Sequence, residues 1–81
     1  MGKHEKLLKV ARNNVDGLSF EEFKTLLRRC HWAFDRQKGS HEIWFSPQHN
    51  RLPIQNRKGK AKGYQVKQFL AILDDEELNH G

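Results

Sequence analysis

The residues best suited to chemistry lie where a turn meets a strand, at Gly39-Ser40-His41. A neutral imidazole can accept a proton as a general base, and its protonated form can return one as an acid. Glu42 follows directly, but neighbouring residues of a strand point to opposite faces of the sheet. We therefore expect His41 and Glu42 to point apart, so that this carboxylate does not orient the imidazole.

Positive charge is concentrated around this histidine. Between Arg36 and Leu73 the chain has eight Lys and Arg residues and one acid, a net charge of +7, whereas the whole chain carries +5. Cleavage of an RNA strand needs a base for the 2′-hydroxyl, a proton for the leaving oxygen, and cations that stabilise charge on the phosphoryl group. The candidate catalytic residue is His41, and the candidate RNA-binding residues are Arg36, Lys38, Ser40, Arg57, Lys58, Lys60 and Lys62.

These residues also have simpler interpretations. His41 can be a strand-end histidine that only packs or hydrogen-bonds, and the cations can form a solvated surface without a polyanionic partner. Trp32 and Trp44 could stack on bases, and Trp44 is the better candidate because it lies on the strand face opposite Ile43. Large aromatic residues in a small sheet are nevertheless more often part of the core.

Composition excludes several classes of protein. The 81 residues are enough for a single domain, over 1–81. One cysteine, Cys30, excludes an internal disulfide framework and a cysteine zinc cage, and the histidines lack a metal-ligand spacing, so we expect neither metal nor cofactor. No segment approaches the roughly 20 apolar residues of a membrane span. We expect a cytoplasmic protein with no membrane partner.

Helical patterns occupy both ends of the chain. Residues 4–12 predict a short helix, which an Asn- and Gly-rich segment ends. Ser19 and Glu22 have the spacing of a capping box and begin a predicted helix over 19–30. From Tyr64 the apolar residues again recur at helical spacing, which predicts a second long helix that ends near Leu78.

The middle of the chain has the pattern of strands. Alternating or bulky residues predict strands over 32–37, 41–46 and 51–56, joined by short turns. Pro53 cannot donate to a strand ladder, so the third strand is expected at an edge or with a bulge. Residues 57–63 are expected to form a flexible basic loop. The expected fold is α+β: a three-stranded antiparallel sheet with two helices on one face, in the order helix–strand–strand–strand–helix, plus a short N-terminal helix.

This order of elements predicts the neighbours of His41. In an antiparallel meander, the start of the second strand lies beside the ends of the first and third strands. His41 should therefore lie near Arg36 and Lys38 on one side and near Gln55 and Arg57 on the other. No second histidine is placed beside it by this pattern, so the sequence leaves the other proton-transfer group unidentified.

The chain carries an ordered set of short motifs, which are 36–41 with Ile43, Trp44 and Phe45, then 52–55, 59–62 and 64–70. Together these motifs resemble the HicA family of toxin–antitoxin mRNA interferases. The resemblance covers 19–78, beyond which 1–18 form an N-terminal extension. It implies a fold like that of double-stranded-RNA-binding domains, cleavage of mRNA, inhibition by a HicB-type antitoxin, and a catalytic role for His41 after Gly-Ser.

One position departs from the family's pattern. Some members carry a histidine at the end of the third strand, where this chain has Gln55-Asn56. Two other functions therefore stay open. One is a non-catalytic RNA-binding module of the same fold, which would recognise helical RNA by its shape and phosphates. The other is a protein-interaction subunit whose basic surface meets an acidic partner.

Overall fold

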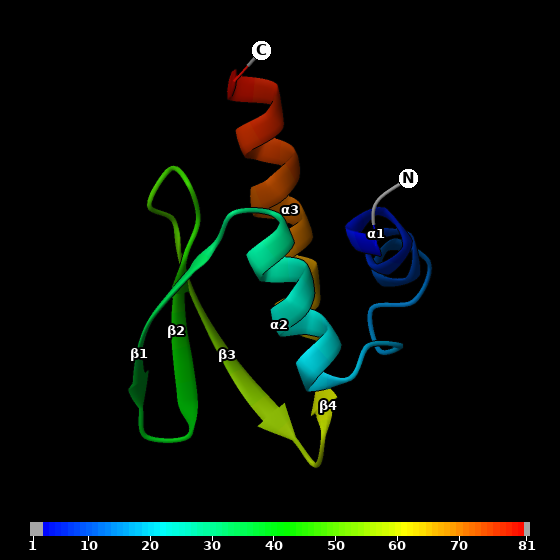
Figure 1. Cartoon of the computed structure of the whole chain (residues 1–81), viewed down its shortest axis with the longest axis vertical. Coiled ribbons are helices and arrows are strands. Elements are labelled where there is room, and N and C mark those ends of the chain that lie inside the picture. The colour runs from blue at the N-terminus through cyan, green and yellow to red at the C-terminus, as the bar shows by residue number, and fades with distance from the viewer. Residues whose placement is uncertain (1–2, 81) are drawn as a thin grey trace.

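Along the sequence, the strands of this protein lie between helices (Figure 1). The computed structural model describes residues 3–80. The three predicted helices and three predicted strands are all present, with ends that differ from the predicted ones by at most two residues. A fourth strand was not predicted. The elements are α1 (Lys3–Asn13), α2 (Phe20–Arg29), β1 (Ala33–Lys38), β2 (His41–Phe45), β3 (Arg51–Arg57), β4 (Lys60–Ala61) and α3 (Gly63–His80).

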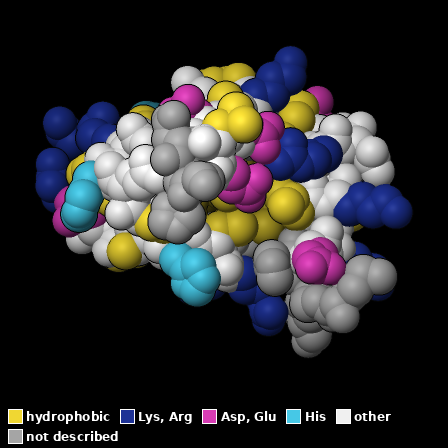
Figure 2. All heavy atoms as spheres, turned by 90° about the horizontal axis from the view of Figure 1, so that it is seen from above, with side chains coloured by type: hydrophobic (Ala, Val, Ile, Leu, Met, Phe, Trp, Pro, Cys, Tyr) yellow, Lys and Arg dark blue, Asp and Glu magenta, His cyan; other side chains and the backbone are white. Residues whose placement is uncertain are grey.

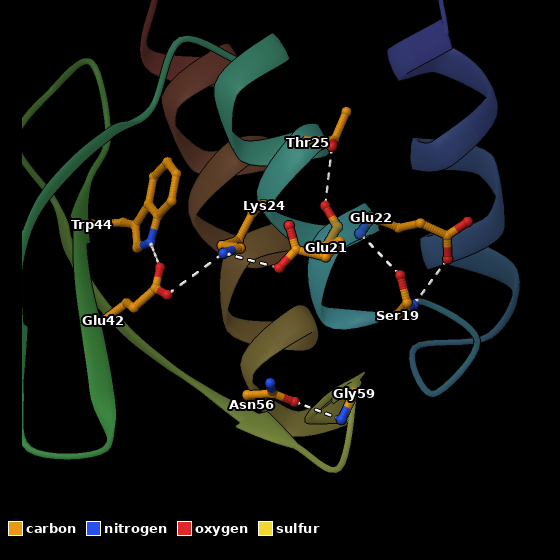
Figure 3. A network of polar contacts seen from close by, with 9 residues as sticks. All are labelled: Ser19, Glu21, Glu22, Lys24, Thr25, Glu42, Trp44, Asn56 and Gly59. Atoms are coloured by element: carbon orange, nitrogen blue, oxygen red, sulfur yellow. Dashed lines mark hydrogen bonds and ion pairs between the residues drawn. The ribbon is translucent and has the colours of Figure 1, made fainter.

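The start of α2 is fixed by the capping box that its sequence predicts. The Glu22 backbone N–H donates to the Ser19 hydroxyl over 3.0 Å, and the Ser19 N–H donates to the Glu22 carboxylate over 2.9 Å (Figure 3). Two of the otherwise unpaired N–H groups at this helix end are thus satisfied. Arg28 and Arg29 lie in the last turn, where cations interact favourably with the helix dipole.

The four strands form one antiparallel sheet in the order β1-β2-β3-β4. A two-residue turn joins β1 to β2, and its first residue, Gly39, has a φ of 62°, which glycine adopts without strain. A bulge interrupts β1 at Asp35, between Phe34 and Arg36. Pro53 lies where β3 has β2 on one side only, because β4 pairs with no residue of β3 before Asn56. The edge position predicted for Pro53 is confirmed, and the bulge lies in β1 instead.

The prediction of a flexible basic loop over 57–63 is wrong, because this segment folds into a tight hairpin. The Gly59 N–H donates to the Asn56 side chain over 2.6 Å, and Gly59 has a φ of 87° (Figure 3). The Phe20 N–H donates to the Gly59 carbonyl, and the Ala61 N–H donates to the Leu18 carbonyl. These bonds hold β4 against both β3 and the start of α2, so the α+β fold is confirmed with four strands rather than three.

The hydrophobic core lies between one face of the sheet and the helices α2 and α3. Phe69 of α3 meets Phe23 of α2 and Trp32 edge-on, with ring centroids 5.8 and 5.5 Å apart. The sheet contributes Trp44, Leu52 and Ile54 to the same cluster. Figure 1 shows α2 and α3 on the same side of the strands, as predicted. Within residues 3–80, no helix lies on the opposite face of the sheet.

Helix α1 packs on the outer side of α2 and α3 (Figure 1). Its Ala11 is fully buried in the common core, and Leu7 and Leu8 pack against it. Arg12 forms an ion pair of 2.6 Å with Asp74 of α3. Through these contacts α1 shares one core with the sheet, α2 and α3. No helix among the described residues is long and apolar enough to cross a membrane.

Charge is separated along the molecule. The β1–β2 and β3–β4 turns, with their cations, lie at one end of the long axis, and the end of α3 lies at the other (Figure 1). Four consecutive acids, 74–77, occupy that second end. Seen from there, acidic side chains gather beside apolar atoms in the middle of the face (Figure 2). A polyanion would therefore be attracted to the end that carries the two turns.

Candidate active site

His41 lies in a shallow hollow on the sheet face that the helices leave open. The hollow has a volume of about 300 Å³ and is lined by Lys38, His41, Ile43, Arg51 and Pro53. In the strand register, His41 is directly opposite Lys38 of β1 and Gln55 of β3. The predicted positions of Lys38 and Gln55 beside His41 are thus confirmed. His41 is half-buried, so the imidazole has protein neighbours and remains accessible to a ligand.

Glu42 points to the other face, as strand alternation predicts. Its carboxylate accepts a hydrogen bond from the Trp44 indole N–H over 3.1 Å and lies 3.6 Å from the Lys24 ammonium of α2 (Figure 3). The Arg28 guanidinium lies 5.7 Å from the centre of the Trp44 ring. Both contacts with α2 place Glu42 and Trp44 on the helix-covered face. The hollow around His41 therefore has no carboxylate among its lining residues.

Gln55 connects the neighbourhood of His41 to the segment that precedes α3. Its side-chain amide N–H donates to the Ser40 hydroxyl over 2.9 Å, and its carbonyl oxygen accepts a hydrogen bond from the Lys62 ammonium. Its backbone N–H donates to the side chain of Gln65, which is buried in α3, over 2.9 Å. Ser40 and Lys62, which are far apart in sequence, are thus held on either side of one residue opposite His41.

The other candidate RNA-binding residues lie apart from this group. Arg57, Lys58 and Lys60 line a second hollow of about 430 Å³ on the β3–β4 hairpin, together with Asp16. Arg36 is exposed opposite Ile43, on the same face as His41, but its guanidinium pairs with Asp35 over 2.7 Å. The structure therefore separates the predicted cations into a group around His41 and a group on the hairpin.

The prediction that Trp44 could stack on bases is wrong. Trp32 and Trp44 are only 4% and 2% exposed, and both belong to the core. The alternation of β2 showed that Trp44 and Ile43 occupy different faces, but it could not show which face the helices cover. Among the Phe, Trp and Tyr residues that the structure describes, Phe34 and Tyr64 are exposed, at 50% and 57%.

Two residues near the site received no role from sequence reasoning. Arg51 lines the hollow of His41 although it is ten residues away, because it begins β3 and its side chain extends over the open face. Tyr64 is exposed at the start of α3, beside Lys62. Arg51 lies in none of the motifs, and its place depends on how β3 meets the sheet. Tyr64 begins the motif 64–70, but that motif gave it no role.

A third hollow, of about 480 Å³, lies at the acidic end of the molecule and is mainly apolar. Cys30, His31 and Leu73 are among its lining residues. Burial raises the pKa of the Cys30 thiol, and the negative charge of Glu77 raises it further. The thiol is therefore held in its protonated, weakly nucleophilic form. Among the described residues no group of three or more His, Cys, Asp or Glu side chains could hold a metal ion.

Comparison with protein families matches residues 20–74 to the family described as the HicA toxin of bacterial toxin–antitoxin. The matched segment begins at α2, includes all four strands and most of α3, and covers more than half of the chain. The chain belongs to the HicA toxin family, which makes it a toxin of the toxin–antitoxin class. Comparison with curated proteins gives no match, and neither does comparison with solved structures.

Proposed function

We propose that this toxin is an mRNA interferase, an endoribonuclease that cleaves mRNA with His41 as its catalytic residue and without a metal ion. The observation that carries the proposal is the position of His41. It begins β2 opposite Lys38, in an open hollow that also contains Arg51. One proton-transfer group in a surface hollow lined by two cations matches the minimum that cleavage of a phosphodiester requires.

In the proposed reaction, His41 accepts the proton of a ribose 2′-hydroxyl while that oxygen attacks the adjacent phosphorus. The bond between phosphorus and the 5′-oxygen of the next nucleotide breaks, and that oxygen receives a proton. The products are a 2′,3′-cyclic phosphate and a 5′-hydroxyl end, so atoms balance without a co-reactant. Lys38 and Arg51 stabilise the charge on the phosphoryl oxygens.

A toxin of this class acts in a pair, so we propose a cognate HicB-type antitoxin that covers the hollow around His41. The net charge of +5 favours an acidic surface on that partner. The nuclease core would be 19–78 within a single domain, with 1–18 as an extension. The proposed place of action is the cytoplasm, where mRNA is the substrate and no cofactor takes part.

The proposal is tested by incubating the purified chain with a mixed RNA pool, with and without EDTA, and separating the products on a denaturing gel. Wild type should cleave equally in both conditions, and His41→Ala should not cleave although it remains folded by circular dichroism. His49→Ala is the matched control, because His49 is an exposed histidine in the β2–β3 turn. Cleavage by His41→Ala at the wild-type rate would refute the assignment of His41.

The second candidate function is a non-catalytic RNA-binding module. The observation in its favour is the group of cations on the β3–β4 hairpin, which lies apart from His41 and could contact phosphates without any chemistry. It predicts salt-dependent RNA binding with intact RNA in every lane of the gel. A protein-interaction subunit, in contrast, would bind an acidic partner and neither bind nor cleave RNA.

A further inference from the structure

Tyr64 is an exposed aromatic residue that the fold does not use for its core. The side chain is 57% exposed, whereas Phe23, Phe69 and both tryptophans are buried. Its hydroxyl accepts a hydrogen bond of 3.3 Å from the side chain of Gln65, the residue after it in α3. One end of the ring is thus anchored, while the rest of the ring is open to solvent.

The contacts of Tyr64 lead directly to the strand position opposite His41. The Gln65 side chain that donates to the Tyr64 hydroxyl also accepts from the Gln55 backbone N–H. The Lys62 ammonium bonds the Gln55 side chain and lies 5.9 Å from the centre of the Tyr64 ring. Gln55 is paired with His41 across β2 and β3. The ammonium is therefore linked to the position of the proposed catalytic group through Gln55, and the ring is linked to it through Gln65 and Gln55.

A cation beside an exposed ring matches the chemistry of one nucleotide. A phosphate carries the negative charge that an ammonium attracts, and a base offers a flat face that can stack on an aromatic ring. Every base has such a face, so this contact tolerates different sequences. A base can reach a ring in this way only if it is unpaired, because bases within a duplex are already stacked and paired.

We propose that Lys62 and Tyr64 form a nucleotide-binding subsite next to His41, in which Lys62 holds a phosphate of the RNA and Tyr64 stacks on an unpaired base. Gln55, the strand partner of His41, accepts a hydrogen bond from the ammonium, which lies 5.9 Å from the centre of the ring. The inference rests on the proposed RNA substrate and specifies its form. The substrate is single-stranded RNA, although the family resemblance implies a fold like that of domains which bind duplexes.

The binding experiment uses the full chain with His41→Ala, so that RNA is not cut during the measurement. The ligands are a fluorescent oligouridylate and a duplex of the same oligouridylate with oligoadenylate, titrated at one salt concentration. Adding Tyr64→Ala should weaken binding of the single strand about 5- to 100-fold, as expected for the loss of one base–aromatic stack. Tyr64→Phe should keep the affinity, and the duplex should bind equally well with or without Tyr64→Ala.

Phe34→Ala is the matched control, because Phe34 is 50% exposed and lies on β1, against Trp44 of the helix-covered face. It should leave the affinity for the single strand unchanged. Equal losses for Tyr64→Ala and Phe34→Ala, or equal losses of single-strand and duplex binding by Tyr64→Ala, would overturn the subsite.

A second variant gives a direct signal and does not depend on the stability of Tyr64→Ala. Tyr64→Trp places an indole at the exposed position, while the native tryptophans are buried and shielded from RNA. Oligouridylate should quench the added emission as it binds and leave the emission of the Tyr64-containing chain almost unchanged. Binding without quenching of the added indole would show that no base stacks there.

The outcome for wild type separates this inference from the proposed function. If wild type cleaves RNA and Tyr64→Ala binds the single strand as tightly as its Tyr64-containing parent, the subsite is wrong and the nuclease stands. If wild type neither binds nor cleaves RNA, the proposed function fails, and the subsite fails with it.

Discussion

Glu76 connects α3 to the turn between β2 and β3, and removing its side chain should measurably destabilise the fold. The carboxylate is only 7% exposed and accepts hydrogen bonds from the Ser46 hydroxyl and from the Asn50 amide, the latter over 2.7 Å. The Gln48 amide donates to the backbone carbonyl of the same residue. One acidic residue thus holds three residues of the turn.

The cost of Glu76→Ala follows from the burial of its partners. Ser46 is 4% exposed, so its hydroxyl loses a charge-assisted hydrogen bond that water does not replace, at a cost of about 1.5–3 kcal/mol. Asn50 is exposed, so water replaces its partner and the loss is small. The carboxylate itself no longer has to be desolvated, which offsets part of the cost. We expect Glu76→Ala to lower the free energy of unfolding by about 2 kcal/mol.

The assay is urea unfolding followed by the fluorescence of the two buried tryptophans. For a small domain with a slope near 1 kcal/mol per molar urea, the midpoint should fall by about 2 M with an unchanged slope. Glu77→Ala is the control, because Glu77 is an exposed acid at the adjacent position of α3. A midpoint for Glu76→Ala no lower than that of Glu77→Ala would refute the claim that this contact stabilises the turn.

Three further predictions follow from single contacts. Ser19→Ala removes the hydroxyl that accepts from the Glu22 backbone N–H, but keeps the Ser19 backbone N–H that donates to the Glu22 carboxylate. Loss of this cap should cost about 1 kcal/mol in urea unfolding, whereas an unchanged midpoint would mean that α2 does not need the hydroxyl. The hydrogen bond from Arg12 lowers the pKa of Asp74, so this carboxylate stabilises the fold above its ordinary pKa and less as pH falls through the lowered value. Because the pair is exposed, Asp74→Asn should cost about 0.2–1 kcal/mol at neutral pH and nothing in acid, and a difference that persists in acid would contradict this origin. Because burial raises the pKa of Cys30, iodoacetamide should alkylate it more slowly at mildly alkaline pH in the folded chain than in urea, and equal rates in mass spectrometry would contradict its shielding.

Local signals predicted the parts of this fold that depend on neighbours in sequence. The capping box at Ser19 and Glu22 located the start of α2, because its bonds join residues three apart. The alternation of β2 separated His41 from Glu42, because that strand is regular from end to end. The position of Lys38 opposite His41 could be predicted because only a short turn separates these two residues in the sequence.

Contacts between distant segments could not be predicted in the same way. β4 has only two residues and exists because Leu18 and Gly59 bring it between β3 and α2. No periodicity indicates such a strand. The alternation correctly predicted that Trp44 and Ile43 lie on opposite faces of the sheet. The burial of Trp44, however, depends on which of these faces packs against α2. The bond between Lys62 and Gln55 depends on how the chain enters α3 after β4.

The open edge of β1 bears on how this protein behaves at high concentration. A strand with one unpaired side is a template for pairing with another chain, and all six residues of β1 are exposed. The bulge at Asp35 breaks the regular spacing of that edge, and the charges of Asp35, Arg36 and Lys38 oppose close approach of an identical strand. The same irregular strand that supplies Lys38 to His41 therefore also protects the molecule from edge-to-edge aggregation.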